Sequence, residues 1–174
     1  TYPHAMDAVL AAGGRLLPVA VDSEHGWDEL ALEQAFTRGN PAMAYLMPEN
    51  HNPVGATMPI ELLERTLAIA AATGTTVVID ESISELGIDA PPRLPAAAFG
   101  RAVLLGSVGK TVWGGVRIGW IRADPSLIET LVRARSAGDL GTAALDQLVV
   151  AELLPDFDEI LRERREFLRR GRDH

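Results

Sequence analysis

The chain has 174 residues, 24 acidic and 16 basic side chains, and a formal net charge of −8. Its length fits one domain with one core, and its residues, 47% hydrophobic and 23% charged, are typical of a folded protein. The lack of cysteine excludes disulfides and cysteine chemistry, and the negative charge argues against nucleic-acid binding by this chain itself. No apolar run reaches the ~20 residues of a membrane-spanning helix and no signal peptide is visible, so we expect a cytoplasmic protein with no membrane partner.

Short apolar runs alternate with amphipathic stretches, a pattern that predicts an α/β domain. Strands are predicted over 16–21, 42–47, 76–79, 102–105 and 117–121. Helices are predicted over 28–38, 59–74, 124–138, 142–154 and from 156 onward. The sheet part is therefore expected over about 1–122 and a helical part over about 124–174. Pro91, Pro92 and Pro95 predict a loop before the fourth strand.

Single residues predict where several of these helices begin and end. Pro59 opens one helix and Gly74 closes it, because proline suits the first helical turn and glycine the left-handed cap. Asp124 caps the next helix, and a capping box that starts at Asp156 opens the last one. Six arginines between 162 and 172 decorate that last helix, which we interpret as a solvated face rather than a nucleic-acid patch.

Polar side chains follow the predicted strands, where open α/β sheets bind their ligands. These clusters lie at 50–53, 80–81, 107–110 and Arg117. Asn52 precedes Asp80 by 28 residues, Asp80 precedes Lys110 by 30, and Lys110 precedes Arg117 by 7. Lys110 is the one lysine of the chain, against fifteen arginines. The four histidines show no metal-ligand spacing, so no metal site is predicted.

One interpretation of Lys110 is a nucleotide-binding phosphate loop, because Gly109-Lys110-Thr111 follows a strand. Such a loop needs a glycine five residues before the second glycine, where this chain has Leu104. It also needs a helix directly after the lysine, whereas Gly114 and Gly115 predict a loop there. The sequence therefore argues against a P-loop-like nucleotide binder.

A second interpretation accounts for all four clusters together. In order and spacing, segments 52–55, 78–81, 107–110 and 115–120 resemble the pyridoxal-phosphate-dependent aminotransferase superfamily, fold type I, class I and II. The resemblance covers nearly the whole chain. It implies a three-layer αβα domain with a mostly parallel mixed sheet, of which residues 1–174 are a partial large domain. The C-terminal small domain of the family is then expected to be absent.

The resemblance also implies a role for each residue toward pyridoxal 5′-phosphate. Lys110 matches the residue that holds the coenzyme as a Schiff base; its amine can lose a proton, whereas an arginine cannot. Asp80 matches the carboxylate that faces the protonated ring nitrogen. Asn52 matches the donor to the phenolic oxygen, and Arg117 the arginine that binds the phosphate. The two remaining matches are Ser107, to the phosphate hydroxyl donor, and Tyr2, to the aromatic that stacks on the ring.

The chain departs from the family after the ring aspartate. Members usually carry a tyrosine two or three residues later, which donates to the phenolic oxygen of the coenzyme. Here those positions hold Ser82 and Ile83. Ser82 has a shorter side chain and Ile83 has no hydrogen-bond donor. We therefore expect this departure to affect the rate of transamination rather than the binding of the coenzyme.

Segments 110–120 and 139–148 and the arginine-rich last helix are similar to the aminotransferase-like domain of GntR-type regulators of the MocR subfamily. In that group an N-terminal winged helix, expected to be absent here, binds DNA, and this domain senses the coenzyme or a small amino compound. We therefore expect the effector domain of a transcription regulator, a homodimer that reaches DNA only through the missing domain. The alternative is a working class I/II aminotransferase, in which Lys110 also shuttles a proton from the substrate α-carbon.

Overall fold

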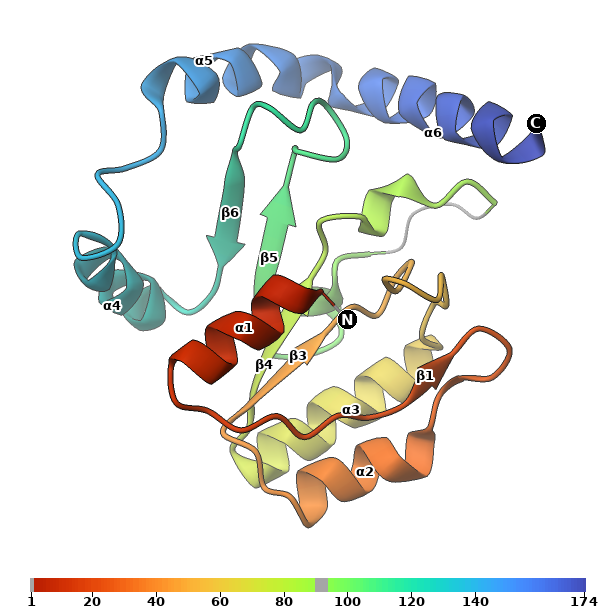
Figure 1. Cartoon of the computed structure of the whole chain (residues 1–174), viewed down its shortest axis with the longest axis vertical. Coiled ribbons are helices and arrows are strands. Elements are labelled where there is room, and N and C mark those ends of the chain that lie inside the picture. The colour runs from red at the N-terminus through yellow and green to blue at the C-terminus, as the bar shows by residue number, and fades with distance from the viewer. Residues whose placement is uncertain (1, 90–93) are drawn as a thin grey trace. The chain divides into compact units, whose positions relative to one another are not determined.

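The computed structural model describes residues 2–89 and 94–174. The chain divides into two compact units, Thr1–Asp80 with Leu94–Val103, and Glu81–Arg93 with Leu104–His174 (Figure 1). Of the predicted proline-marked loop, Pro91 and Pro92 lie outside the described residues. Pro95 directly precedes a 3₁₀ turn, η2 (Ala96–Ala98).

The first unit combines helices with short strands. Its elements are α1 (Pro3–Ala11), β1 (Val21–Asp22), β2 (Gly26–Trp27), α2 (Glu29–Thr37), β3 (Met43–Leu46), α3 (Ile60–Thr73) and β4 (Thr76–Asp80). β1 and β2 form an antiparallel hairpin, whereas β3 and β4 are parallel. α2 packs on α3, and α3 packs on β4 (Figure 1).

The predictions of α2 and α3 are confirmed, and α3 also has its predicted ends. The Asp28 side chain accepts a hydrogen bond from the backbone N–H of Ala31 at 2.9 Å, which satisfies one of the free donors at the start of α2. Pro59 is the N-cap of α3, and Gly74 ends that helix in the left-handed conformation at φ 72°. Between these caps α3 buries one apolar stripe that includes Leu63, Leu67 and Ala70.

The prediction of a strand over 16–21 is wrong, and helix α1 was not predicted. Leu16 and Leu17 are exposed, and only Val21 enters the β1–β2 hairpin. The Asp22 carboxylate makes that hairpin turn by accepting backbone N–H bonds from residues 24 and 25. α1 buries none of its residues.

The second unit carries an antiparallel strand pair and a helical second half. Its elements are η1 (Ser84–Leu86), β5 (Val103–Ser107, begun in the first unit), β6 (Gly119–Arg122), α4 (Pro125–Arg135), α5 (Ala144–Leu153), η3 (Leu154–Asp156) and α6 (Phe157–Asp173). β5 pairs with β6 with Leu105 opposite Ile121. Parallel and antiparallel pairings thus both occur, as in a mixed sheet.

The element ends of this unit match the sequence predictions in part. Asp124 caps α4 as predicted, accepting from the Ser126 N–H at 3.0 Å. The capping box at Asp156 is wrong: this residue ends η3, which runs directly into α6, so its backbone is not extended and its side chain caps nothing. The last strand begins at Gly119, two residues after the predicted start at Arg117.

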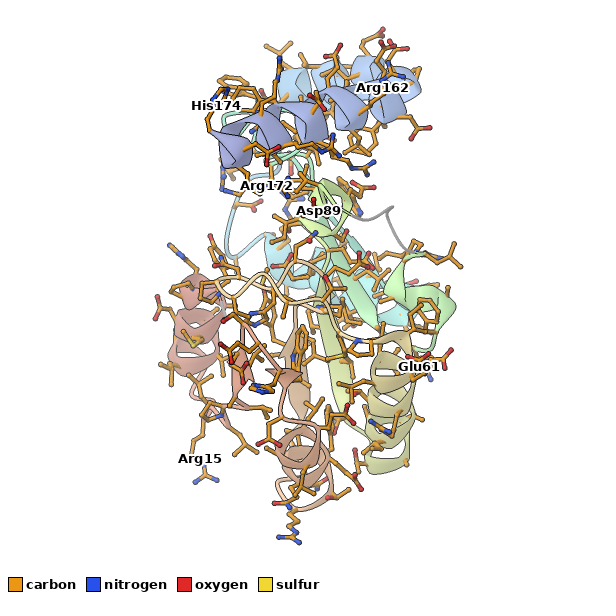
Figure 2. All side chains as sticks on the ribbon, turned by 90° about the vertical axis from the view of Figure 1, so that its right-hand side faces the viewer. Arg15, Glu61, Asp89, Arg162, Arg172 and His174 are labelled. Atoms are coloured by element: carbon orange, nitrogen blue, oxygen red, sulfur yellow. The ribbon has the colours of Figure 1, made fainter. Side chains whose placement is uncertain are left out.

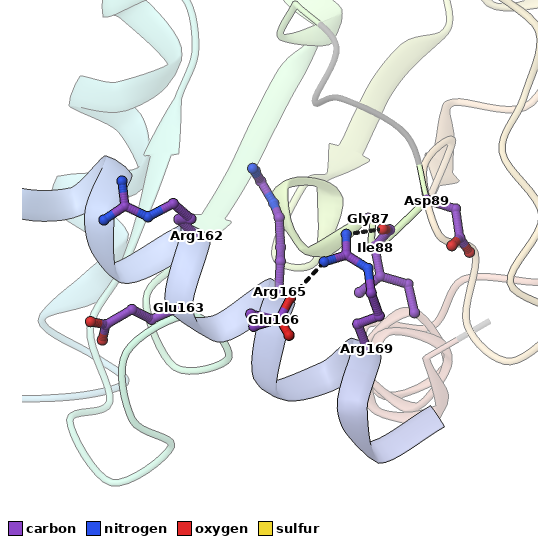
Figure 3. A pocket seen from close by; sticks show the side chains of 8 residues that line it. All are labelled: Gly87, Ile88, Asp89, Arg162, Glu163, Arg165, Glu166 and Arg169. Atoms are coloured by element: carbon purple, nitrogen blue, oxygen red, sulfur yellow. Dashed lines mark hydrogen bonds and ion pairs between the residues drawn. The ribbon is translucent and has the colours of Figure 1, made fainter. Parts of the chain in front are cut away.

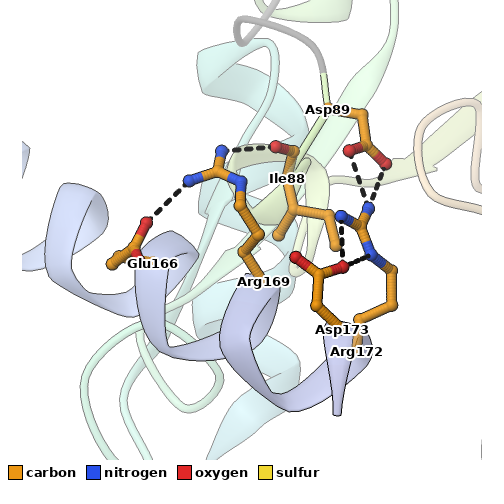
Figure 4. Close-up of polar contacts among 6 residues, drawn as sticks. All are labelled: Ile88, Asp89, Glu166, Arg169, Arg172 and Asp173. Atoms are coloured by element: carbon orange, nitrogen blue, oxygen red, sulfur yellow. Dashed lines mark hydrogen bonds and ion pairs between the residues drawn. The ribbon is translucent and has the colours of Figure 1, made fainter.

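The arginines of α6 are not simply a solvated face. Arg165 donates to the backbone carbonyl of Glu85 and Arg169 to that of Ile88, each at 2.6 Å. Arg172 pairs with the carboxylate of Asp89 (Figures 2 and 4). Three arginines at helical spacing thus tie α6 to the segment around η1, and the groove beside them is lined by both signs of charge (Figure 3).

Three buried valines form a hydrophobic cluster in the second unit. Val108 and Val116 lie on the segment between β5 and β6, and Val150 lies on α5. Phe157, at the start of α6, packs against the same cluster. This cluster fixes the loop on which Lys110 lies. Among the described helices, none has the length and apolar character to cross a lipid bilayer.

Candidate functional site

Asp80 lies at the carboxyl end of β4, and its carboxylate accepts a hydrogen bond from the phenol of Tyr45 on β3. The two strands are parallel with Tyr45 opposite Val78. Because side chains alternate along a strand, Asp80 faces the same side as Val78 and therefore the same side as Tyr45. Val77 and Ile79 face the opposite, buried side. The strand pair thus presents one oriented carboxylate at its end.

Asn52 lies in a tight loop that follows β3. The loop folds back on itself: the backbone N–H of Met58 donates to the Pro48 carbonyl at 2.7 Å, and His51 donates to Ala56 at 2.8 Å. Gly55 occupies the left-handed region at φ 74°, which closes the turn. Asn52 is exposed at the tip of this loop. The predicted amide donor, Asn52, therefore lies on a loop that backbone hydrogen bonds hold in place.

Tyr2, the predicted stacking aromatic, directly precedes α1. Its side chain is 45% exposed and its ring stacks on that of His4, with 5.0 Å between centroids. Its phenol also contributes to raising the pKa of Tyr45, after the larger effects of burial and of Asp80. Tyr2 and the Tyr45–Asp80 pair therefore belong to one neighbourhood of the first unit.

Lys110 lies on a turn directly after β5, and its side chain is exposed. The Ser107 hydroxyl holds this turn, because it accepts the Gly109 N–H at 3.0 Å and donates to the Ile118 carbonyl at 3.2 Å. A second bond, from the Val108 N–H to the same carbonyl, joins the two segments again. Ser107, Lys110 and Arg117 are thus brought onto one local scaffold. The Ser107 proton is engaged there, so the hydroxyl must give up Ile118 to donate to a phosphate.

Arg117 lies before β6 rather than at the start of it, as was predicted. Its side chain is exposed. Its backbone adopts a left-handed φ of 51°. This conformation costs a non-glycine residue roughly 1–2 kcal/mol. A strained residue beside a polar turn is typical of functional loops.

Sequence reasoning missed two residues of the first unit, Tyr45 and His51. His51 is 6% exposed and its ring meets that of Trp27 edge-on at 5.4 Å. Burial lowers the pKa of His51 below its ordinary value. Within the described part of the chain, its Nδ1 has no hydrogen-bond partner. His51 is therefore a buried histidine, which its place in a turn-rich segment did not indicate.

The structure also bears on the phosphate-loop interpretation. Residues 109–116 after β5 form turns, and the next helix of the described chain begins only at Pro125. A phosphate loop needs a helix N-terminus directly after the lysine. The geometry around Lys110 therefore excludes that class of site.

Comparison with known proteins identifies the class. The chain matches the family described as aminotransferase class I and II over residues 1–174. It is 34% identical over 163 residues to the 2-aminoadipate transaminase of Thermus thermophilus, covering 90% of this chain and 41% of that protein. It is 30% identical over 159 residues to the probable rhizopine catabolism regulatory protein MocR of Rhizobium meliloti, covering 90% of this chain and 30% of that one.

Solved structures agree with this assignment. The crystal structure of the Thermus thermophilus α-aminoadipate aminotransferase LysN, complexed with N-(5′-phosphopyridoxyl)-L-leucine, superposes with a TM-score of 0.86 at 33% identity. That match covers 95% of this chain and 44% of the other. The chain belongs to the class I and II aminotransferase family and has the α/β fold of its large domain. It spans less than half the length of these relatives.

Pyridoxal 5′-phosphate is the cofactor of this family, and the donors of this chain fit its chemistry. The coenzyme needs an amine for its aldehyde, a carboxylate for its ring nitrogen and cationic or hydroxyl donors for its phosphate. Lys110 offers an exposed amine on a fixed turn, and Asp80 offers a carboxylate that already acts as an acceptor. Arg117 and Ser107 lie on the scaffold of Lys110, and Asn52 on a turn of its own.

Proposed function

We propose that the chain is the pyridoxal-phosphate-binding, aminotransferase-like effector domain of a GntR/MocR-type transcription regulator. The observation that carries coenzyme binding is the turn of Lys110, which the Ser107 hydroxyl ties to the segment of Arg117. The similarity to MocR favours the regulator. So does the absence of a tyrosine at positions 82 and 83, where Ser82 and Ile83 stand.

Each predicted residue has a distinct task in this proposal. Lys110 would hold the coenzyme covalently through its amine, which can lose a proton. Asp80 keeps a proton on the ring nitrogen, which is what lets the coenzyme withdraw electrons when bound. Arg117 forms charge-assisted hydrogen bonds with the phosphate, and Asn52 donates to the phenolic oxygen. Two further tasks complete the set: Ser107 holds the Lys110 turn or donates to the phosphate, and Tyr2 stacks on the ring.

A working aminotransferase is the second candidate, favoured by the 34% identity to the 2-aminoadipate transaminase. In that case Lys110 also carries a proton between the substrate α-carbon and the coenzyme. Either protein is expected to act in the cytoplasm as a homodimer. A regulator would respond to the coenzyme or a small amino compound and would contact DNA through a domain outside this sequence.

Borohydride reduction tests the covalent link to Lys110. The purified protein should be yellow with pyridoxal phosphate, and reduction should add one coenzyme to the peptide that contains Lys110. Lys110→Arg keeps the charge and should abolish the adduct, because a guanidinium does not lose its proton. Arg101→Lys, a matched control, adds a lysine outside the proposed residues and should leave the adduct on Lys110. A colourless wild-type protein without an adduct would overturn coenzyme binding.

Turnover separates the two candidates. An aminotransferase should pass amino groups from an amino acid to a keto acid over many cycles, and Lys110→Ala should abolish this. A regulator should change its coenzyme spectrum on adding an amino compound but should not turn over. Multiple turnovers at a steady rate would contradict the regulator proposal.

A further inference from the structure

We propose that Tyr45 is a positioning residue of the coenzyme site: by donating its phenol hydrogen to Asp80, it orients that carboxylate toward the ring nitrogen. The inference rests on the proposed function and adds a residue to it. Within the first unit, Tyr45 and Asp80 are 35 residues apart in sequence but share one hydrogen bond.

The strand register makes this contact specific. Tyr45 lies opposite Val78 in the parallel pair of β3 and β4, and Asp80 is two residues farther along the same face. Diagonal neighbours of this kind are roughly 7–8 Å apart at the backbone, a gap that only a long side chain bridges. A tyrosine at this position reaches the carboxylate, whereas a serine or threonine would not.

The protonation states support the direction of the hydrogen bond. Burial, followed by the hydrogen bond to and charge of Asp80, raises the pKa of Tyr45 well above its ordinary value. The phenol therefore keeps its proton and is the donor, and the Asp80 carboxylate is the acceptor. A donor held against one carboxylate oxygen fixes the orientation of that carboxylate.

The consequence concerns the contact between the carboxylate and the ring nitrogen. With Tyr45 in place, the Asp80 carboxylate is held in one orientation, in which it would accept from a protonated ring nitrogen. Without the phenol, the carboxylate would be free to turn, and its support of the protonated ring would weaken. This role differs from that of the usual family tyrosine, which acts on the phenolic oxygen and whose positions hold Ser82 and Ile83 here. Tyr45 would act instead on the side of the ring nitrogen, through Asp80.

The test uses nitrogen NMR of the purified protein loaded with ¹⁵N-labelled pyridoxal phosphate, because the ring nitrogen shift separates the protonated from the neutral ring. Tyr45→Phe removes only the hydroxyl, so the fold should be kept. We expect the shift to move toward the neutral ring and the coenzyme to dissociate about tenfold more readily. Thr76→Val removes a hydroxyl from the same face at the far end of β4 and should change neither.

A double variant shows whether Tyr45 acts through Asp80. Asp80→Asn should also give the neutral ring, and adding Tyr45→Phe to it should have no further effect on the nitrogen shift. If the two substitutions changed the nitrogen shift additively, Tyr45 would not act through Asp80. An unchanged shift in Tyr45→Phe with the Lys110 adduct intact would also overturn the role of Tyr45, while leaving the proposed function standing. Failure of the wild-type protein to form the adduct would instead overturn the proposed function.

Discussion

Arg117 combines a predicted phosphate-binding role with a left-handed backbone, and the two properties can be separated by substitution. At φ 51° glycine adopts the left-handed conformation without steric strain, whereas alanine remains strained there as arginine is. We therefore expect Arg117→Gly to be more stable than Arg117→Ala by about 0.5–1 kcal/mol in urea unfolding. At Arg122, inside strand β6, the order should reverse, because glycine weakens a strand. The same order at both positions would contradict the left-handed conformation.

His51 makes the stability of the protein depend on pH. Burial lowers its pKa in the folded state below the ordinary value of 6.5, so the folded protein prefers the neutral ring. The stability that His51 contributes is complete above pH 6.5 and is lost as the pH falls through the lowered folded pKa. The free energy of unfolding should thus fall more steeply between pH 7 and pH 5 in the wild type than in His51→Gln. His174→Gln, at an exposed site, should keep the wild-type slope.

At the residue scale, the sequence was informative where chemistry demands one residue type. Lys110 is a candidate because one lysine stands among fifteen arginines, and Asp80 is one because it ends an apolar strand. Tyr45 could not be recognised, since its contact with Asp80 depends on the register of β3 against β4. Alternation places each residue on a face of its own strand, but no pattern in one sequence states which residues pair across two strands.

At the scale of elements, the arginines of α6 differ in what they stabilise. Arg165 donates to a partly buried backbone carbonyl, that of Glu85, and Arg162 pairs with the exposed Glu159 side chain. Arg165→Met should lower the free energy of unfolding by about 1–2 kcal/mol, because it removes a charged donor from a partly buried acceptor. Arg162→Met should change little in the same urea experiment, as expected of surface ion pairs. Equal losses would contradict this division.

The helices and strands were predictable where the sequence carries capping residues and a regular apolar pattern. α2, α3 and α4 have caps and apolar periodicity, and all three lie close to the predicted positions. The strand over 16–21 failed because apolar residues indicate a strand only if they are buried, and exposure is a property of the folded chain. The predicted start of β6 was wrong for a different reason. The left-handed backbone of Arg117 ends the regular pairing, and an arginine side chain does not indicate such a backbone.

At the scale of the whole molecule, α5 presents an uncovered apolar stripe. Leu145, Leu148 and Val149 are each more than half exposed and lie three and four residues apart on one helical face. We expect this stripe to drive association of chains, in keeping with the proposed homodimer. Leu145→Glu with Leu148→Glu should lower the mass measured by light scattering. Glu152→Gln, on the same helix, should not. A wild-type protein that is monomeric at every concentration would contradict this expectation.

The exposed turn of Lys110 also has a consequence for proteolysis. An endoprotease that cuts only after lysine finds one peptide bond in this chain, and that bond lies in an accessible turn beside the proposed point of coenzyme attachment. Digestion should therefore yield two pieces, residues 1–110 and 111–174. A coenzyme attached to the amine removes the charge that such a protease recognises, so loading would leave the chain whole. Whether the chain is cut after Lys110 would therefore show whether the coenzyme is attached to that lysine.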